Sequence, residues 1–339
     1  MDAKKVLSLI LAGPVAIALL SFVLGQDANW DLKNYHLYVP YAVIHGRLTI
    51  DHNAAGIQTY SNPTLDLLTT YPLFRVAGPV GHALFIGALQ GLNVIILVLI
   101  VTTLQAGQDS SSSHRFSMAL LAAFLGISGA VSFSEVGTSF GDLTTSVLIL
   151  LALYSVLRIL SASDSLLTRR HVIACGLGLG LAAGLKLTNA CFAVPILCCL
   201  PFFLTENRLR VTATAAFWVC VGLLLTHGWW SFWLWLHYGN PLFPYFNGIF
   251  KSPYFPEISF FDVRFFPRNL IESVFYPFYF SWLPRTAELP FRDFRFPLGY
   301  VCVILVICYF VYSKVTRRPN IKLSRPFGFL AAFMVLAYL

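Results

Sequence analysis

The apolar run VLSLILAGPVAIALLSFVL (Val6–Leu24) is soon followed by WDLKNYHLYVPYAVIHGR (Trp30–Arg47), a stretch rich in aromatic and polar side chains. About 20 residues of helix cross the hydrocarbon core of a bilayer, so the first stretch is long enough to cross it. Tyr and Trp side chains prefer the boundary between lipid and water, because one end of each is apolar and the other polar. The two stretches therefore predict a helix that crosses a membrane and a second helix that lies at its surface.

The composition of the whole chain favours lipid as its main solvent. Of its 339 residues, 57% are hydrophobic and only 11% are charged, with a mean hydropathy of +0.72. Soluble domains carry about 25% charged residues, which is enough to wet their surface. Long apolar runs continue after the first one, which excludes a secretory signal followed by a soluble domain. We therefore expect an all-α polytopic membrane protein with a single transmembrane domain over residues 1–339.

The apolar runs predict about nine transmembrane helices. The predicted spans are Val6–Leu24, Ala83–Leu104, Ser117–Phe133, Leu143–Leu160, Val172–Leu185, Asn189–Leu204, Val211–Trp230, Leu298–Tyr312 and Phe327–Leu339. Two long outer loops, at about residues 25–81 and 237–297, are expected to contain interfacial helices. The last run has no polar tail after it, so we expect a C-terminal part of the protein to be missing from this sequence.

The charge distribution predicts the orientation of the chain. If Lys4 and Lys5 are inside, every inner loop is short and basic, as the positive-inside rule requires. The basic groups of these loops are His114–Arg115, Arg169–His171, Arg208 with Arg210, and Lys314 to Arg325. The net charge of +8 is explained by this rule, and nucleic acid is not an expected partner. We expect a multi-pass protein of the bacterial inner membrane with a cytoplasmic N-terminus.

The seven cysteines lie inside apolar segments without a metal-binding or redox spacing, so they are expected to be lipophilic side chains. The sequence holds no Walker motif, HExxH or GxSxG in a usable context, which leaves nucleotide-driven transport and proteolysis without support. No cofactor is expected. A divalent cation would need a closed set of oxygen ligands, which sequence spacing does not indicate.

Four polar segments lie on the predicted outer face. They are WDLKNYH (Trp30–His36), SEVGTSFGD (Ser134–Asp142), GLAAGLKLTNA (Gly180–Ala190) and HYGNPLFPYFN (His237–Asn247). Their order along the chain resembles that of the GT-C superfamily, integral membrane glycosyltransferases that use polyprenyl-phosphate sugars, such as protein O-mannosyltransferases and aminoarabinose transferases. The resemblance implies that Asp31, at the start of the first outer loop, is the catalytic base. This chain departs from the family where Leu32 follows Asp31, because many members have two adjacent acids there.

The chemistry of glycosyl transfer assigns further candidates on the outer face. A carboxylate within hydrogen-bond reach takes the proton of the acceptor hydroxyl, and cations stabilise the phosphate that leaves. Lys186, Arg264 and Arg268 are candidates for contact with this phosphate. Alternatively, Lys186 marks the edge of the membrane by extending its amine towards water, and the two arginines pin or solvate a loop.

Other polar residues of the outer segments are expected to bind substrate. Glu135 and Asp142 could position the acceptor, bind a cation together with Asp31, or cap helices, and Asp142 stands where an N-cap is expected. Helical spacing places Asp31, Tyr35 and Tyr38 on one side of the interfacial helix. The remaining candidates are Tyr35 and His36, which is also interpretable as a structural histidine, and Tyr60, Asn62 and Asp66 in the segment Gly56–Pro72.

Three functions remain open at this point. The first is a glycosyltransferase that moves a sugar from a polyprenyl-phosphate donor to a glycan, lipid or protein acceptor, by metal-independent inverting displacement. The second is a transporter or flippase, which would place ionisable groups near the middle of the membrane. The third is a non-catalytic assembly protein of envelope glycan synthesis. The polar groups gather outside the predicted spans, which favours the first.

Overall fold

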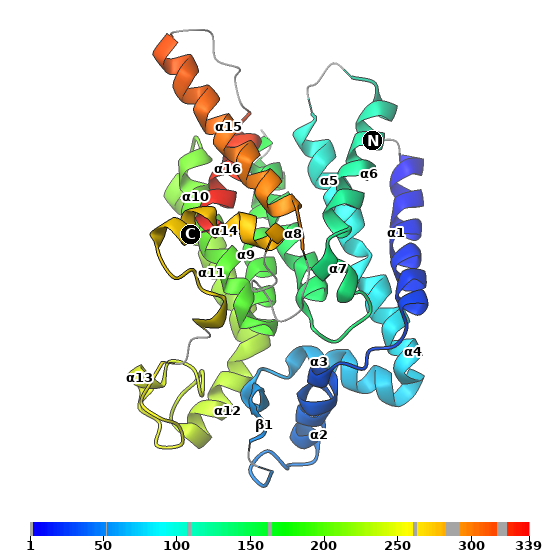
Figure 1. Ribbon diagram of the computed structural model, residues 1–339, viewed down its shortest axis with the longest axis vertical. Helices are drawn as coiled ribbons and strands as arrows, with labels where there is room; N and C mark the ends of the chain where they lie inside the picture. Colours follow the sequence, from blue (N-terminus) through cyan, green and yellow to red (C-terminus); the bar gives the residue numbers. More distant parts are fainter. Residues whose placement is uncertain are drawn as a thin grey trace.

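The computed structural model shows an almost entirely helical chain and describes residues 3–51, 53–106, 110–161, 165–259, 263–282, 292–316 and 324–338. Figure 1 shows a bundle of long helices above a smaller layer of short elements. The bundle contains α1 (Ala3–Leu24), α4 (Thr70–Gln90), α5 (Leu92–Leu104), α6 (Ser112–Ile127), α7 (Ala130–Ser134), α8 (Asp142–Ser161), α9 (Ser165–Leu185), α10 (Ala190–Phe203), α11 (Arg208–Leu223), α14 (Leu270–Trp282), α15 (Arg295–Thr316) and α16 (Arg325–Tyr338).

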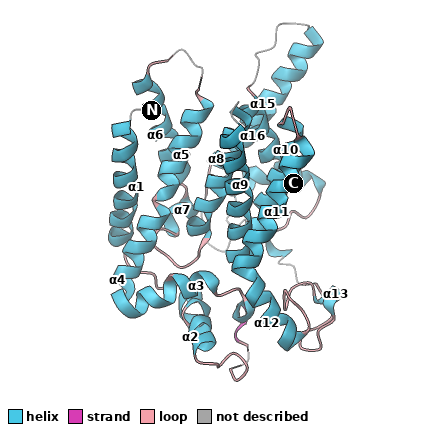
Figure 2. Cartoon of the chain, turned by 180° about the vertical axis from the view of Figure 1, so that it is seen from behind, coloured by secondary structure: helices cyan, strands magenta, loops and turns pink. Residues whose placement is uncertain are grey.

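The lower layer and the connections hold the short elements. They are the π-helical turn η1 (Leu32–His36), α2 (Tyr38–Ile44), the strand β1 (Ala54–Ile57), the 3₁₀ turn η2 (Gln58–Tyr60), α3 (Thr64–Leu68), the 3₁₀ turn η3 (Leu187–Asn189), the π-helical turn η4 (Leu224–Gly228), α12 (Trp229–Tyr238), α13 (Asn247–Phe250) and the 3₁₀ turn η5 (Val263–Phe265). Figure 2, seen from behind, shows the same separation, with the N-terminal end of α1 far from α2, α12 and α13.

Four helical stretches of the described chain are long and apolar enough to cross a membrane. They are Thr70–Leu104, Asp142–Ser161, Arg208–Tyr238 and Arg295–Ser313, and shorter apolar helices cover Leu11–Leu24, Leu187–Phe203 and Arg325–Ala337. All nine predicted segments coincide largely with helices, and in the described residues four helical stretches meet the length and composition of a membrane span, so the number nine stays a prediction. Arg317, Arg318 and Lys322 of the last predicted inner loop, and the final residue Leu339, lie outside the described residues.

Large apolar side chains cover the outside of the bundle. Val23, Phe202 and Leu209 are each about four-fifths exposed, and many other Leu, Val and Phe side chains are more than half exposed. Soluble proteins avoid continuous apolar surfaces of this kind. The interior core, centred on Val156, Leu179 and other buried residues of α8, α9, α10 and α16, is small by comparison.

Glycines bring α9 and α11 into close contact. A Cβ atom at Gly180 would lie 2.1 Å from the carbonyl oxygen of Val219, and one at Gly176 would lie 2.2 Å from that of Ala215. On the facing helix, a Cβ at Gly222 would lie 2.7 Å from the backbone of Leu181. Small residues spaced four apart are the usual way for helices to approach each other in lipid, where packing and not hydrophobicity drives association.

The segment predicted as the first outer loop turns into the bundle at Gly78. This residue has a φ of +69°, and Pro79 follows it, so one helical trace bends sharply inside α4. The part of α4 before the bend runs across the bottom of the bundle, and the part after it rises beside α1 (Figure 1). Ser21 of α1 donates a hydrogen bond of 2.8 Å to the carbonyl of Ala83 and joins the two helices.

The predicted span Ser117–Phe133 is interrupted. Helix α6 ends at Ile127, and α7 begins after Gly129. The guanidinium of Arg295 caps the C-terminal end of α6, because it donates to the carbonyls of Leu125 and Gly126, each at 2.7 Å. A side chain at Gly129 would collide with this guanidinium. An arginine from a distant helix therefore ends a helix that the apolar pattern alone would continue.

Candidate functional site

The stretch that follows α1 forms a π-helical turn and not a regular helix. The amide of Leu37 donates to the carbonyl of Leu32, five residues back, at 3.2 Å. The hydroxyl of Tyr35 lies beside the carboxylate of Asp31, and burial, together with this carboxylate, raises the pKa of Tyr35 well above its usual range. Tyr38 does not join them as the helical spacing predicted, because the extra residue of the turn rotates it towards Asp51, to which its hydroxyl donates.

His36 and Asp66 form a buried pair beside Tyr35. Nδ1 of His36 lies 2.8 Å from Oδ2 of Asp66, and both side chains are about one-tenth exposed. The Tyr35 ring packs against the His36 imidazole, with centroids 4.3 Å apart and planes tilted by 39°. The pKa of Tyr35 is also raised by the charges of Asp66 and of Asp142. Tyr35 therefore stands among three carboxyl groups from three segments of the chain.

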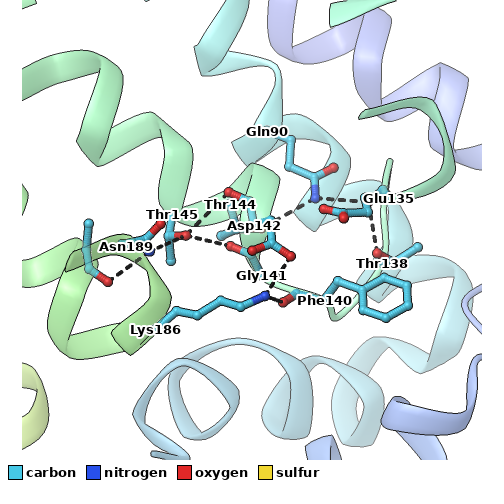
Figure 3. Close-up of polar contacts among 11 residues, drawn as sticks. Gln90, Glu135, Thr138, Phe140, Gly141, Asp142, Thr144, Thr145, Lys186 and Asn189 are labelled. Carbon is cyan, nitrogen blue, oxygen red and sulfur yellow. Dashed lines mark hydrogen bonds and ion pairs between the residues drawn. The ribbon is translucent and has the colours of Figure 1, made fainter. Parts of the chain in front are cut away.

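The link between α7 and α8 is held in shape by two polar side chains from elsewhere. Asp27, after α1, accepts hydrogen bonds from the amide and the hydroxyl of Ser139, both at 2.8 Å. Gln90, at the end of α4, accepts from the amide of Gly137 at 2.8 Å. It also donates to the carbonyl of Glu135 at 3.3 Å (Figure 3). Because Asp27 and Gln90 are themselves buried, they fix where this link presents its two acids.

Glu135 is a buried carboxyl group with an unusual environment. Burial, and next the charge of Asp142, raise its pKa to about 7, although Lys186 and the amide of Leu143 pull the pKa down. Its Oε2 atom has no hydrogen-bond partner within the described structure. A carboxyl group of this kind holds a proton near neutral pH, and such groups gather at functional sites.

Lys186 reaches the same place from the end of α9. Its amine donates to the carboxylate of Asp142 at 2.6 Å and to the carbonyl of Phe140 at 2.9 Å, and Figure 3 shows its side chain extended towards both. Asp142 is the first residue of α8, and its carboxylate pairs with this amine. Asn189 anchors the turn after Lys186 by donating to the hydroxyl of Thr145 at 2.9 Å.

A cavity of about 700 Å³ adjoins these acids. Glu135 and Asp142 line it together with Gln90 and Asn93, and most of the remaining lining is apolar. The apolar lining includes Ile17, Val94, Phe124, Phe133, Leu150 and Phe333, from α1, α5, α6, α7, α8 and α16. The cavity is therefore a largely apolar space inside the bundle, with carboxyl groups at one part of its wall.

Four sequence candidates have other surroundings. Asn62 joins the first outer loop to the bundle, since its amide donates to the carbonyls of Gly184 at 2.6 Å and Thr226 at 2.9 Å. Tyr60 packs in an aromatic cluster and lines a different cavity. The guanidinium of Arg264 lies 5.0 Å from the centre of the Phe265 ring. Arg268 donates its backbone amide to Glu272 at 2.6 Å.

The main charges that bear on Tyr35 and Glu135 come from Asp31, Asp66, Asp142 and Lys186. The sequence did not single out Asp27 or Gln90. A signal for both exists in hindsight, because a lone polar residue at the end of an apolar helix must find a partner once it is buried.

In the described part of the chain, no three His, Cys, Asp or Glu side chains form a group that could hold a metal ion. A comparison of the chain with protein families, characterised proteins and solved structures finds no match.

Proposed function

We propose that this chain is a membrane glycosyltransferase that moves a sugar from a polyprenyl-phosphate donor to an acceptor hydroxyl. The observation that carries the proposal is the grouping of Asp31, Tyr35, Asp142 and Lys186, with Glu135 beside them on the wall of the apolar cavity. These are the parts that the reaction needs, namely a base, a cation, a proton-holding acid and an apolar space. The acceptor is a glycan, a lipid or a protein.

In this proposal Asp31 is the catalytic base. Its carboxylate takes the proton of the acceptor hydroxyl while the oxygen attacks the anomeric carbon, and the bond from that carbon to the phosphate oxygen breaks. The electron pair leaves with the polyprenyl phosphate. A single base without a covalent nucleophile supports direct displacement, so the product has the inverted anomeric configuration. The reaction as proposed needs no metal.

Lys186 would stabilise the departing phosphate. It is paired with Asp142 in the free protein, and both side chains are partly exposed, at 30% and 48%. Because exposed ion pairs are weak, little free energy is lost when Lys186 exchanges this carboxylate for a phosphate. The apolar cavity provides room for part of the polyprenyl chain.

The same proposal includes nine membrane crossings and a cytoplasmic N-terminus in the bacterial inner membrane. It is supported by the exposed apolar side chains of the bundle and by the position of the acidic site at the end of the bundle opposite the N-terminal end of α1. A phosphate whose lipid tail stays in the bilayer lies at that depth. Tyr35 and His36 would then border the sugar.

The test is product formation by membranes that contain the protein, with a radiolabelled polyprenyl-phosphate hexose as donor. Asp31→Asn keeps the size of the side chain and removes the base, and we expect it to lower the rate of transfer by about 100-fold or more. Glu257→Gln, which removes an exposed outer carboxylate, is the matched control and is expected to be active. Full activity of Asp31→Asn at normal expression would refute the proposal. Label that crosses the membrane without a new glycosidic bond would assign a transporter instead.

A further inference from the structure

A second cavity, of about 590 Å³, lies in the lower layer between the first outer loop and the segment after α12. Five aromatic side chains line it: Tyr60, Tyr238, Phe243, Tyr254 and Phe255. The proposed transferase reaction uses none of them. In Figures 1 and 2 the elements β1 and α12, whose ends border the cavity, lie side by side below the bundle.

The aromatic rings of this cavity fix one another. Tyr238 and Phe243 are stacked with centroids 4.4 Å apart and planes at 10°, and Tyr60 meets both of them edge to face at 5.2 and 4.7 Å. Tyr254 meets Tyr238 at 5.5 Å and 89°, yet its side chain is 67% exposed. Phe243 and Tyr238 are buried, so the cavity has a rigid aromatic floor and one exposed ring at its edge.

The loop that carries Tyr254 is held by an internal polar network. Asn247 is fully buried, and its amide donates to the carbonyls of Ser252 at 3.0 Å and Phe255 at 2.8 Å. Asn240 is also fully buried and donates to the carbonyl of Tyr245 at 3.0 Å. Backbone carbonyls that accept such bonds are fixed in place. The exposed ring is therefore presented by a preorganised loop, which is typical of a binding loop.

The polar groups of the cavity are suited to an uncharged ligand. Thr49, Asn53 and His237 add a hydroxyl, an amide and an imidazole to its lining, and the hydroxyls of Tyr60 and Tyr238 lie beside each other. None of the lining residues, all of which the structure describes, is Asp, Glu, Lys or Arg. An aromatic cavity for a quaternary ammonium group usually gains from a nearby carboxylate, and a phosphate site needs a cation, so neither ion fits well.

We propose that this aromatic cavity is a saccharide-binding site. The C–H face of a pyranose ring would stack on the exposed ring of Tyr254, and its hydroxyls would bond with Asn53 and with the paired tyrosine hydroxyls. The volume lies within the roughly 300–1,000 Å³ of small-molecule sites and exceeds what a single sugar ring fills. The cavity and the acidic site share one packed cluster, which contains both Tyr60 and Tyr35. Binding here does not require the transferase activity.

Saturation-transfer NMR on the full chain in lipid nanodiscs tests this site, because no sugar-based detergent is then present. The probes are methyl α-D-mannopyranoside, methyl β-D-glucopyranoside and methyl β-D-galactopyranoside, each without any donor. We expect transfer to the ring C–H protons of at least one probe, loss of this transfer in Tyr254→Ala, and its retention in Tyr254→Phe. Phe250→Ala, at an exposed aromatic residue of the same loop that does not line the cavity, is the control and is expected to bind.

Three results would overturn the proposal. They are no transfer to any of the three sugars, equal transfer in the wild type and Tyr254→Ala, and transfer to choline but to no sugar. Because Tyr254 is exposed, its substitution is not expected to unfold the protein, and circular dichroism of the variant checks this. An inactive transferase with intact sugar binding would refute the proposed function and leave this site standing.

Discussion

The buried carboxyl group of Glu135 should make the stability of the protein depend on pH in a definite direction. Its pKa is about 7 in the folded chain against 4.5 as the ordinary value. Between these two values the folded chain binds more protons than the unfolded chain, so the free energy of unfolding falls as the pH rises. The contribution of protonated Glu135 to the free energy of unfolding is fully present below pH 4.5, and it is lost as the pH rises through 7. At about 1.4 kcal/mol for each pH unit, the total loss is about 3 kcal/mol.

Glu135→Gln removes this dependence, because the amide cannot lose a proton. We compare the free energy of unfolding of the variant with that of the wild type at each pH. From pH 5 to pH 8 this difference should shift by about 2–3 kcal/mol in favour of the variant. The assay is equilibrium unfolding in mixed micelles by SDS, followed by circular dichroism at the two pH values. Glu257→Gln, at an exposed carboxylate, should keep the pH dependence of the wild type.

Infrared spectroscopy provides a direct check of the protonated group. The carbonyl stretch of a protonated carboxyl should be present in the wild type at pH 6, fade with a midpoint near pH 7, and be missing from Glu135→Gln. If the two proteins instead differ in stability by the same amount at pH 5 and pH 8, Glu135 is charged in the folded state. The account of its burial would then be wrong.

Three further substitutions test other parts of the structure. Gly180→Val should destabilise the protein by about 2 kcal/mol or more in SDS unfolding, because its Cβ would lie 2.1 Å from the carbonyl of Val219; an unchanged midpoint would contradict this packing. Asn62→Ala should cost about 1–3 kcal/mol in the same assay, because two backbone carbonyls lose their donor, and activity should fall only as far as folded protein is lost. Lys186→Ala should change stability by less than about 1 kcal/mol, since its pair with Asp142 is partly exposed, yet lower the transfer rate at least tenfold; equal activity would remove Lys186 from the mechanism.

The helices of the bundle could be predicted because lipid leaves the backbone few alternatives. A segment in the hydrocarbon core must satisfy its own hydrogen bonds, so an apolar run such as Leu143–Leu160 predicts a helix, and α8 covers it. Of two details that the apolar pattern missed, one depends on a contact between distant residues and the other on a local Gly-Pro pair. Arg295 ends α6 from almost half the chain away, and Gly78 bends α4 within a continuous helical trace. The contact of Arg295 has no local sequence signal, whereas the Gly78–Pro79 pair is a local helix-breaking signal that the apolar pattern does not include.

The acidic site divides in the same way. Asp31 and Tyr35 could be predicted as neighbours from their spacing of four. Lys186 and Asp142 could be predicted as neighbours because each stands where an apolar run meets a predicted outer segment. The pair of His36 with a residue of α3 could not be predicted, since nothing in the spacing of two loop segments fixes their register. The side chain of Asn62 carries both a donor and an acceptor, which suits a ligand-binding residue. The same two groups allow it to join two segments of the chain instead, as the structure shows.

The charge balance of the acidic site explains why its carboxyl groups cannot all act alike. Asp31 and Asp142 lie close enough to raise the pKa of Tyr35 together, and Lys186 is the cation paired with Asp142. A phosphate would add more negative charge to this group, and a charged Glu135 would add to the repulsion. Because burial keeps a proton on Glu135 up to about pH 7, this cost would be avoided in the proposed complex with a phosphate donor. In the proposed reaction the same proton keeps Glu135 from serving as the base, and this role falls to the half-buried Asp31. The proposal thus assigns the separate roles of base and proton-holding acid to two carboxyl groups with different surroundings.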